Sequence, residues 1–122
     1  MGSFRVACQI INHVRRTRTA EVPDLLVDTG SECTWIAEKV LGRIGIKPEK
    51  KDMTFVMANG VMVTRNVGFA ILRIGDAITT DEVVFAQSGD LCLLGSRTLE
   101  GMNLRVDPRA KRLVAAGPIP AA

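Results

Sequence analysis

One short segment of the chain carries the residue types best suited to chemistry. The apolar run Leu25 to Val27 leads directly into Asp28, Thr29, Gly30 and Ser31. Gly30 permits a sharp turn, and functional groups often lie in loops at strand ends. The hydroxyls of Thr29 and Ser31, with N–H groups of the turn, can hydrogen-bond the Asp28 carboxylate and favour its charged form. The segment therefore predicts one oriented carboxylate at the end of a strand.

A single carboxylate is not enough to hydrolyse a peptide with water. That reaction needs two carboxyls within hydrogen-bond reach, one ionised to take a proton from water and one protonated to polarise the carbonyl. The sequence supplies Asp-Thr-Gly only once, so the second copy must come from another molecule. A two-fold axis through the turn provides it, and two like charges about 3 Å apart then share a proton. The hypothesis is a homodimeric endopeptidase with an Asp28/Asp28′ pair.

The elements that must position this segment are mostly short strands. Phe4–Val14 and Val22–Val27 are rich in apolar residues, with a polar loop between them. Trp35–Ile44 spaces its apolar residues three to five apart and ends at Gly45, a pattern that favours a short helix with a glycine stop.

A hairpin is predicted next along the chain. Met53–Met57 and Val61–Thr64 flank Ala58, Asn59 and Gly60, and an Asn-Gly turn is expected to place both central residues at positive φ. The remaining predicted elements are strands at Val67–Ile74 and Ile78–Ala86, an apolar run at Leu91–Gly95, a helix at Ser96–Asn103, and a hairpin of Leu104–Asp107 with Lys111–Ala115. Many short strands with one or two short helices predict an all-β fold, a small closed barrel.

Length, net charge and cysteine content exclude several classes of protein. The 122 residues, 47% hydrophobic and 24% charged, fit one globular domain. The net charge of +3 comes from scattered basic residues without stacking aromatics beside them, so no nucleic-acid partner is expected. Three cysteines without CxxC spacing predict neither disulfides nor a metal site, and favour a reducing, cytoplasmic location. No membrane association and no cofactor are expected.

The ordered motifs resemble those of the retropepsin-like aspartic proteases. Leu25 to Gly30 is similar to the catalytic loop of that family, Phe55 to Val63 to its flap, and Leu93-Leu94-Gly95 to its hydrophobic-hydrophobic-glycine segment. The similarity is greatest to the small single-lobed members of bacteria and archaea. It covers residues 4–116, which are expected to form the protease domain, whereas residues 117–122 are expected to be a disordered tail.

The resemblance also implies roles for individual residues. It implies Asp28 as the catalytic carboxyl, Thr29 as a brace across the dimer, and Gly30 as a backbone contact to substrate. The other implied substrate contacts follow the loop, line side-chain pockets or form the flap tip: Ser31, Glu32, Cys33, Trp35, Leu91, Leu93, Ala58, Asn59 and Gly60. The substrate would be an extended peptide added as a strand between flap and floor.

Several alternatives remain open on the sequence. Asp-Thr-Gly alone is a weak motif, because an aspartate in a turn is often a local cap. Ser96-Arg97 follows Gly95 where the viral enzymes place the arginine first, and Glu32 is expected either to bind substrate or to pair with an arginine such as Arg97. The same fold could serve as a non-catalytic dimeric module that binds peptides or joins partners, or as a self-processing protein.

Overall fold

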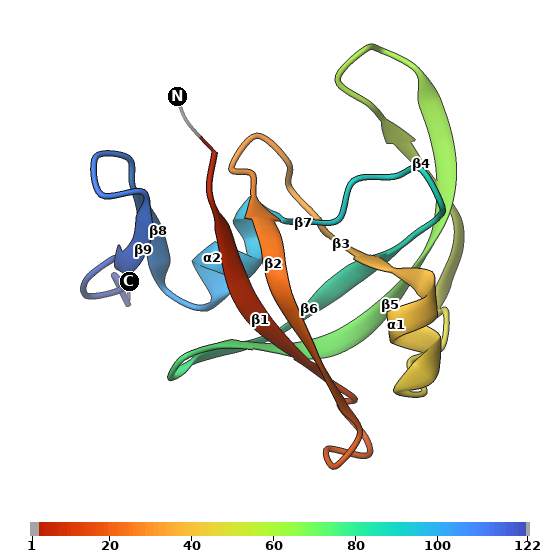
Figure 1. Ribbon diagram of the computed structural model, residues 1–122, viewed down its shortest axis with the longest axis horizontal. Coiled ribbons are helices and arrows are strands. Elements are labelled where there is room, and N and C mark those ends of the chain that lie inside the picture. The colour runs from red at the N-terminus through yellow and green to blue at the C-terminus, as the bar shows by residue number, and fades with distance from the viewer. Residues whose placement is uncertain (1–2, 122) are drawn as a thin grey trace.

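The computed structural model describes residues 3–121. Short strands dominate this part of the chain, as Figure 1 shows. In chain order the elements are β1 (Arg5–Ile11), β2 (Thr19–Val27), β3 (Thr34–Ala37), α1 (Glu38–Arg43), β4 (Lys50–Val56), β5 (Met62–Ile74), β6 (Ala77–Ala86), β7 (Leu93–Leu94), α2 (Ser96–Gly101), β8 (Leu104–Asp107) and β9 (Arg112–Ala115).

The main sheet closes into a ring. Its strands are hydrogen-bonded in the order β1-β2-β7-β3-β6-β5-β4, and an additional antiparallel pairing of β1 with β5 joins the two sides. Aliphatic side chains fill the interior, and Ile10, Leu25, Ile36, Leu72 and Leu94 are almost completely buried. This pairing covers the open edge of β1 and leaves β4 as the end strand of the sheet. The prediction of a small, closed, all-β barrel with short helices is therefore confirmed.

The β4–β5 hairpin continues beyond this ring (Figure 1). Its turn differs from the prediction, because Gly60 has a φ of 82° whereas Asn59 does not have a positive φ. The Gly60 N–H donates to the Met57 carbonyl at 2.8 Å, so Ala58 and Asn59 are the central residues of the turn. Gly60 follows them in the left-handed conformation, an arrangement typical of three-residue hairpin loops.

Two predicted boundaries are wrong. Trp35 and Ile36 belong to strand β3, parallel to β6, and the helix α1 begins only at Glu38. The apolar spacing is the same for a helix and for a strand buried on both faces, and here sheet pairing decides. The strands expected at Val61–Thr64 and Val67–Ile74 form one continuous strand, β5. The stop at Gly45 is confirmed, with a φ of 77°.

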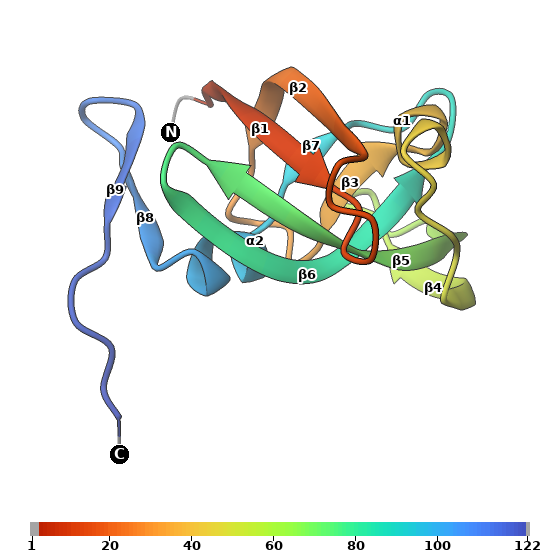
Figure 2. The same ribbon diagram turned by 90° about the horizontal axis from the view of Figure 1, so that it is seen from below.

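The last part of the chain forms a second, smaller sheet. The predicted hairpin is confirmed as antiparallel β8 and β9, with Leu104 opposite Ala115 and Asp107 opposite Arg112. Asn103 Nδ2 donates to the Gly117 carbonyl at 2.7 Å. The chain after Gly117 forms no helix or strand up to Ala121 and runs away from the barrel (Figure 2). The last predicted tail residue, Ala122, lies outside the described residues.

Neither helix in the described part of the chain has the length or the apolar character required to cross a membrane.

Candidate active site

Sheet pairing places Asp28 at a fixed point on the barrel. It follows β2 directly, and β2 pairs in parallel with β7 through Leu26 with Leu93 and Val27 with Leu94. The pairing continues one residue further, because the Asp28 N–H donates to the Leu94 carbonyl at 3.0 Å. The two apolar segments predicted to flank the site therefore lie side by side, and the strand end fixes the Asp28 backbone.

The loop after Asp28 holds the carboxylate by local hydrogen bonds. Asp28 Oδ1 accepts a hydrogen bond from the Gly30 N–H at 2.9 Å. A Cβ on Gly30 would lie 3.2 Å from the same oxygen, so a side chain there would crowd the carboxylate. The Ser31 hydroxyl donates to the Cys33 carbonyl at 3.1 Å. The Thr29 side chain is exposed and makes no such bond in the described structure.

The start of α2 supports this loop from the other side. The Ser96 N–H donates to the Ser31 carbonyl at 2.8 Å, and the Arg97 N–H donates to the Glu32 carbonyl at 3.1 Å. A Cβ at Gly95 would lie only 2.4 Å from the Cys33 carbonyl oxygen. The Leu-Leu-Gly segment thus needs its glycine because the loop backbone packs directly against it.

A buried chain of hydroxyls connects the loop, α2 and β6. The Gly95 N–H donates to Thr34 Oγ1 at 3.0 Å, Thr34 Oγ1 lies 2.6 Å from Thr98 Oγ1, and Thr98 Oγ1 donates to Asp81 Oδ2 at 2.8 Å. Because the Thr98 hydrogen is directed at Asp81, Thr34 must be the donor to Thr98. Both threonine side chains are fully buried, and every donor in the chain has an acceptor.

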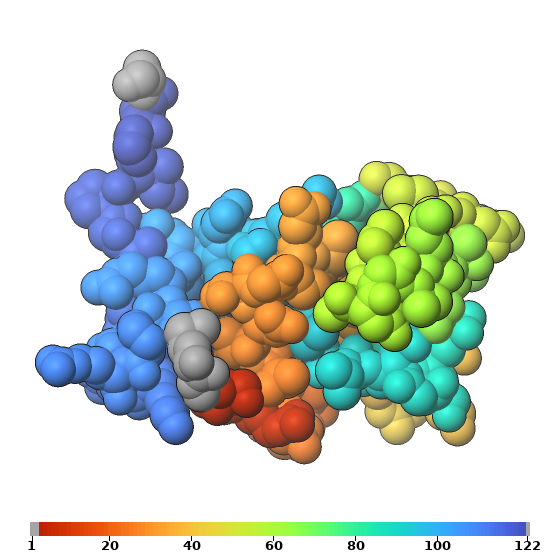
Figure 3. Space-filling model, turned by 90° about the horizontal axis from the view of Figure 1, so that it is seen from above, coloured from red at the N-terminus to blue at the C-terminus, as the bar shows by residue number. Residues whose placement is uncertain are grey.

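A cleft of about 710 Å³ opens beside Asp28, between the loop and the β4–β5 hairpin. Figure 3 shows the orange segment that contains the loop and the yellow-green hairpin on one face of the molecule. Most of the predicted site residues line this cleft: Asp28, Gly30, Ser31, Glu32, Cys33, Trp35, Ala58, Leu91 and Leu93. Thr29, Asn59 and Gly60 are not among its lining residues.

About half of the residues of the cleft wall were not predicted from the sequence. The missed residues come from β4, β5, β6, α2 and the loop before β7: Lys50, Met53, Thr54, Phe55, Val56, Met57, Val67, Glu82, Gly89, Asp90 and Arg97. The apolar members of β4 lie in the predicted flap strand, so the flap resemblance itself pointed to them. Glu82 and Asp90 carried no local signal, because their position in the cleft depends on tertiary structure.

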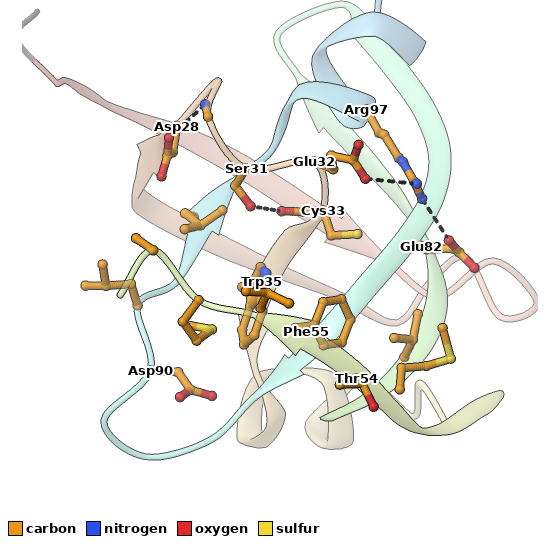
Figure 4. Close-up of a pocket in the computed structure, with 18 of the residues that line it drawn as sticks. Asp28, Ser31, Glu32, Cys33, Trp35, Thr54, Phe55, Glu82, Asp90 and Arg97 are labelled. Atoms are coloured by element: carbon orange, nitrogen blue, oxygen red, sulfur yellow. Dashed lines mark hydrogen bonds and ion pairs between the residues drawn. The ribbon is translucent and has the colours of Figure 1, made fainter. Parts of the chain in front are cut away.

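Ion pairs form a row along one side of the cleft. Arg97 Nη2 lies 3.2 Å from Glu32 Oε2, and Arg97 Nη1 lies 3.4 Å from Glu82 Oε2 (Figure 4). Glu82 also pairs with Lys50. Of the two roles considered for Glu32, the structure therefore shows the ion pair with Arg97.

Asp90 is paired more tightly, on the other side of the cleft. Arg65 Nε donates to Asp90 Oδ2 at 2.7 Å and Nη2 donates to Oδ1 at 2.8 Å. These bonds from Arg65 lower the pKa of the Asp90 carboxyl. Among the cleft carboxylates in residues 3–121, Asp28 alone has no cationic partner.

The cleft thiol is a poor nucleophile. Burial raises the pKa of Cys33, and the neighbouring Arg97 opposes this shift only in part. A thiol with a raised pKa stays protonated at neutral pH, whereas the thiolate is the reactive form. Asp28 is thus the better candidate for chemistry in this cleft.

A second, smaller hollow lies on the opposite side of Asp28. It is lined by Ser3, Phe4, Leu26, Val27, Asp28, Thr29, Gly30 and Val106. The Asp28 carboxylate therefore stands at the border between the two hollows. The exposed Thr29, which does not reach the cleft, belongs to this second surface.

Comparison with known proteins agrees with this geometry. No curated protein matches the chain significantly. A family model described as aspartyl protease matches residues 17–113, which include the Asp28 loop, the hairpin, the Leu-Leu-Gly segment and α2. This match covers most of the chain, and the ringed sheet is consistent with a retropepsin-like fold. The chain therefore belongs to the retropepsin-like aspartyl protease family.

Proposed function

We propose that the protein is an aspartic endopeptidase in which Asp28 of two identical subunits forms the catalytic pair. The observation that carries this proposal is the state of Asp28: it borders the cleft, its orientation is fixed by the Gly30 N–H, and no cation neutralises it in the described structure. Glu32, Glu82 and Asp90 are each engaged by a basic side chain. Each of these carboxylates therefore has a cationic partner in the described structure, whereas Asp28 has none.

The missing carboxyl is supplied by a second copy of the chain. In aspartic proteases generally, two aspartates share one proton; the ionised one takes a proton from water while the protonated one polarises the peptide carbonyl. The hollow around Phe4, Leu26, Thr29 and Val106 supports this arrangement, because it exposes apolar surface next to Asp28. A two-fold axis there brings the two carboxylates together.

The cleft suits an extended peptide. Trp35, Leu91 and Leu93 provide apolar surface for its side chains, and the Gly30 backbone and Ser31, Glu32 and Cys33 follow the loop beside the scissile bond. Ala58, Asn59 and Gly60 form the tip of a flap that closes over the peptide and excludes water. Thr29 braces the paired loops across the dimer. The domain responsible spans residues 4–116, with 117–122 as a tail.

A cytoplasmic location is part of the same proposal. Cys8, Cys33 and Cys92 are all free thiols, and unpaired cysteines are typical of reducing compartments.

Replacement of the catalytic carboxyl tests the proposed reaction. Asp28→Asn should reduce cleavage of a peptide library by about 10⁴-fold or more, because an amide cannot accept the proton from water. Asp24→Asn is the matched control, since Asp24 is an exposed aspartate of β2, the strand that leads into Asp28. The assay is run from pH 4 to 7 with sedimentation analysis to show that both variants remain folded and associated.

Two results would contradict an enzymatic role. Cleavage that survives Asp28→Asn would assign the activity to another protein or residue. A wild-type dimer that cleaves no peptide, yet binds extended peptides as tightly as Asp28→Asn does, would instead favour a non-catalytic binding module.

A further inference from the structure

The β4–β5 hairpin needs a tether to the barrel. β5 pairs with β6 only from Val67 onward, whereas the residues from Met62 to Arg65 pair with β4 alone. The projecting part is thus a two-stranded ribbon, and such ribbons are marginally stable by themselves in water. Side-chain contacts must therefore hold the ribbon at a given distance from the cleft floor.

Arg65 makes the best-formed of these contacts. Its guanidinium binds Asp90 through two parallel hydrogen bonds of 2.7 and 2.8 Å. The exposed fractions of the two side chains are 14% and 11%, so water competes little for the pair. Bidentate charge-assisted bonds of this kind are stronger and more directional than single ones.

Hydrogen bonds to nearby backbone groups also fix the orientation of each side chain of the pair. Asp90 Oδ2 also accepts a hydrogen bond from the Gln87 N–H at 2.8 Å, and the Asp90 N–H donates to the Gln87 carbonyl at 3.0 Å. Arg65 Nη1 donates to the Thr64 carbonyl at 2.8 Å. The pair therefore joins a fixed turn, residues 87–90, to a fixed position on the hairpin.

The two segments that the pair joins both line the cleft. Gly89, Asp90 and Leu91 come from the loop before β7, and Phe55 comes from the hairpin strand opposite Val63. In Figure 4 Asp90 lies on one side of the cleft, with Trp35 and Phe55 across from it. The ion pair thus fixes the distance between the hairpin and the loop before β7, which form two walls of the cleft.

The other contacts of the hairpin are either exposed or non-directional. Lys50 pairs with Glu82, but 46% of the Lys50 side chain is exposed, and exposed ion pairs contribute little. Trp35 and Phe55 meet edge to face with ring centroids 5.2 Å apart. Met57 and Val63 also pack against the apolar cluster that contains Trp35, but apolar burial is non-directional and does not fix the hairpin in one position.

We infer that the Arg65–Asp90 pair is a clamp that holds the hairpin over the cleft and thereby positions it for peptide binding. The expected effect on peptide cleavage rests on the proposed function, whereas the expected opening of the hairpin does not. Without the clamp the hairpin samples open positions, and a peptide must first select the closed one. Peptide binding then weakens while the chemistry at Asp28 is preserved.

Two variants remove the clamp in different ways. Arg65→Lys keeps the positive charge and the aliphatic stem but loses the planar fork, and Asp90→Asn removes the negative charge. The matched controls are Arg73→Lys, in an exposed part of the same strand, and Asp76→Asn, in the exposed turn after it. Arg65→Lys is the milder change and keeps the test valid should Asp90→Asn fold poorly.

Hydrogen exchange tests the clamp without any substrate. Amides of residues 53–64 should exchange about tenfold faster in both clamp variants, while amides of β1 and β2 and both controls stay at the wild-type rate. Trp35 provides a second signal, because it is the single tryptophan of the chain and touches Phe55. Its emission should shift to longer wavelength as the hairpin opens.

Kinetics separates positioning from general stability. With a cleaved peptide, KM should rise about tenfold in both clamp variants while kcat stays within about threefold of wild type. Unchanged exchange in residues 53–64 would overturn the clamp, and so would faster exchange spread equally over β1 and β2. If wild type cleaves nothing, the proposed function fails, but the exchange result still decides the clamp.

Discussion

The surroundings of individual side chains in the cleft shift their pKa values in different directions. Two hydrogen bonds from Arg65 lower the pKa of the Asp90 carboxyl, and burial opposes them only in part. Burial raises the pKa of the Cys33 thiol. Asp90 is therefore ionised and engaged at neutral pH, while Cys33 is protonated and inert. Because Asp28 has no cationic partner in the part of the chain that the structure describes, it is the cleft carboxyl that is available for proton transfer.

The lowered pKa of Asp90 makes stability depend on pH in a defined direction. In the folded state this carboxyl binds a proton less readily than in the unfolded state, where its pKa has the ordinary value of 3.8. Its contribution is complete above that value and is lost as the pH falls through the lowered folded pKa. Asp90→Asn should therefore reduce the free energy of unfolding at pH 6, and the difference from wild type should narrow below about pH 4.

Urea unfolding of Asp90→Asn and wild type between pH 3 and pH 7 measures this difference. Asp76→Asn serves as the comparison, because Asp76 lies in an exposed turn. A difference between Asp90→Asn and wild type that stays constant from pH 6 to pH 3 would show that the Arg65 contact does not perturb Asp90.

Sequence reasoning identified Asp28 but not its electrostatic surroundings. Asp28 was predictable because an apolar strand, a carboxylate and a glycine stand next to one another in the chain. Arg65 and Asp90 are 25 residues apart and belong to segments without a recognisable motif. Their contact exists only because the hairpin and the loop before β7 meet in three dimensions.

Short elements around the loop do most of the positioning. β7 has only two residues, yet it pairs with both β2 and β3. α2 begins immediately afterwards and donates two backbone N–H groups to the loop carbonyls of Ser31 and Glu32. The Thr34–Thr98–Asp81 chain then attaches α2 to β6 inside the barrel. Loss of a single buried hydroxyl should therefore loosen several elements together.

Thr98→Val tests this connection. The valine has nearly the same shape, but it leaves the Thr34 hydroxyl without its acceptor and Asp81 without its buried donor. Unsatisfied buried groups of this kind cost about 1–3 kcal/mol, so the free energy of unfolding should fall by that amount in a urea titration. Thr80→Val, at an exposed position of β6, is the matched control and should unfold like wild type. Equal stability of Thr98→Val and Thr80→Val would show that the hydrogen bonds of Thr98 do not contribute to the free energy of unfolding.

Element boundaries near the site were harder to predict than the elements themselves. Trp35 and Ile36 were expected in a helix because their spacing is compatible with one, but β6 and β7 on either side recruit them into a strand. The Asn59-Gly60 sequence correctly placed the hairpin, while its turn has one more residue than the two-residue type. For Trp35 and Ile36, partners distant in sequence decided the geometry, whereas for the turn it was the local pairing of Met57 with Val61.

The molecule as a whole presents one half-buried acid, Asp28, between two hollows of different character. The larger is lined by many side chains and extends under the hairpin, whereas the smaller is bounded by the N-terminal segment, the loop and β8. In Figure 1 the β8–β9 hairpin lies next to α2, on the side of the barrel away from β4. The small sheet thus borders the proposed dimer face.

Charge placed on this face should prevent association. Near a two-fold axis, a residue lies close to its own copy, so an added arginine meets another arginine. Ser3 and Thr29 are exposed and line the smaller hollow, and the double variant Ser3→Arg/Thr29→Arg should fold normally. Its association constant should fall by about tenfold or more, as measured by sedimentation equilibrium.

Thr80→Arg is the control for this experiment, because its exposed side chain lies outside both hollows. A wild-type chain that sediments as a monomer at every concentration would refute the proposed pairing of Asp28 residues. Equal association of the double variant and Thr80→Arg would place the contact on another face.

The barrel itself was predictable because its motifs follow one another in a fixed order. The Asp28 loop, the hairpin and Leu93-Leu94-Gly95 bracket most of the chain, and alternating short apolar runs between them leave few other folds. A closed barrel was predicted, but the strands that close it, β1 and β5, were not, since their pairing joins Gln9 to Arg73, residues far apart in the sequence.

Under the proposed pairing of two Asp28 residues, the position of Asp28 on the border of the two hollows makes protein abundance a control on proteolysis. When copies are few, most chains are separate and each carries a lone acid that cannot activate water. The rate of peptide cleavage then rises more steeply than in proportion to the protein concentration, because each active dimer contains two chains. Under the same proposal, a small molecule bound against Phe4 and Val106 would prevent the pairing, and with it the activity, without entering the cleft proposed to bind peptides.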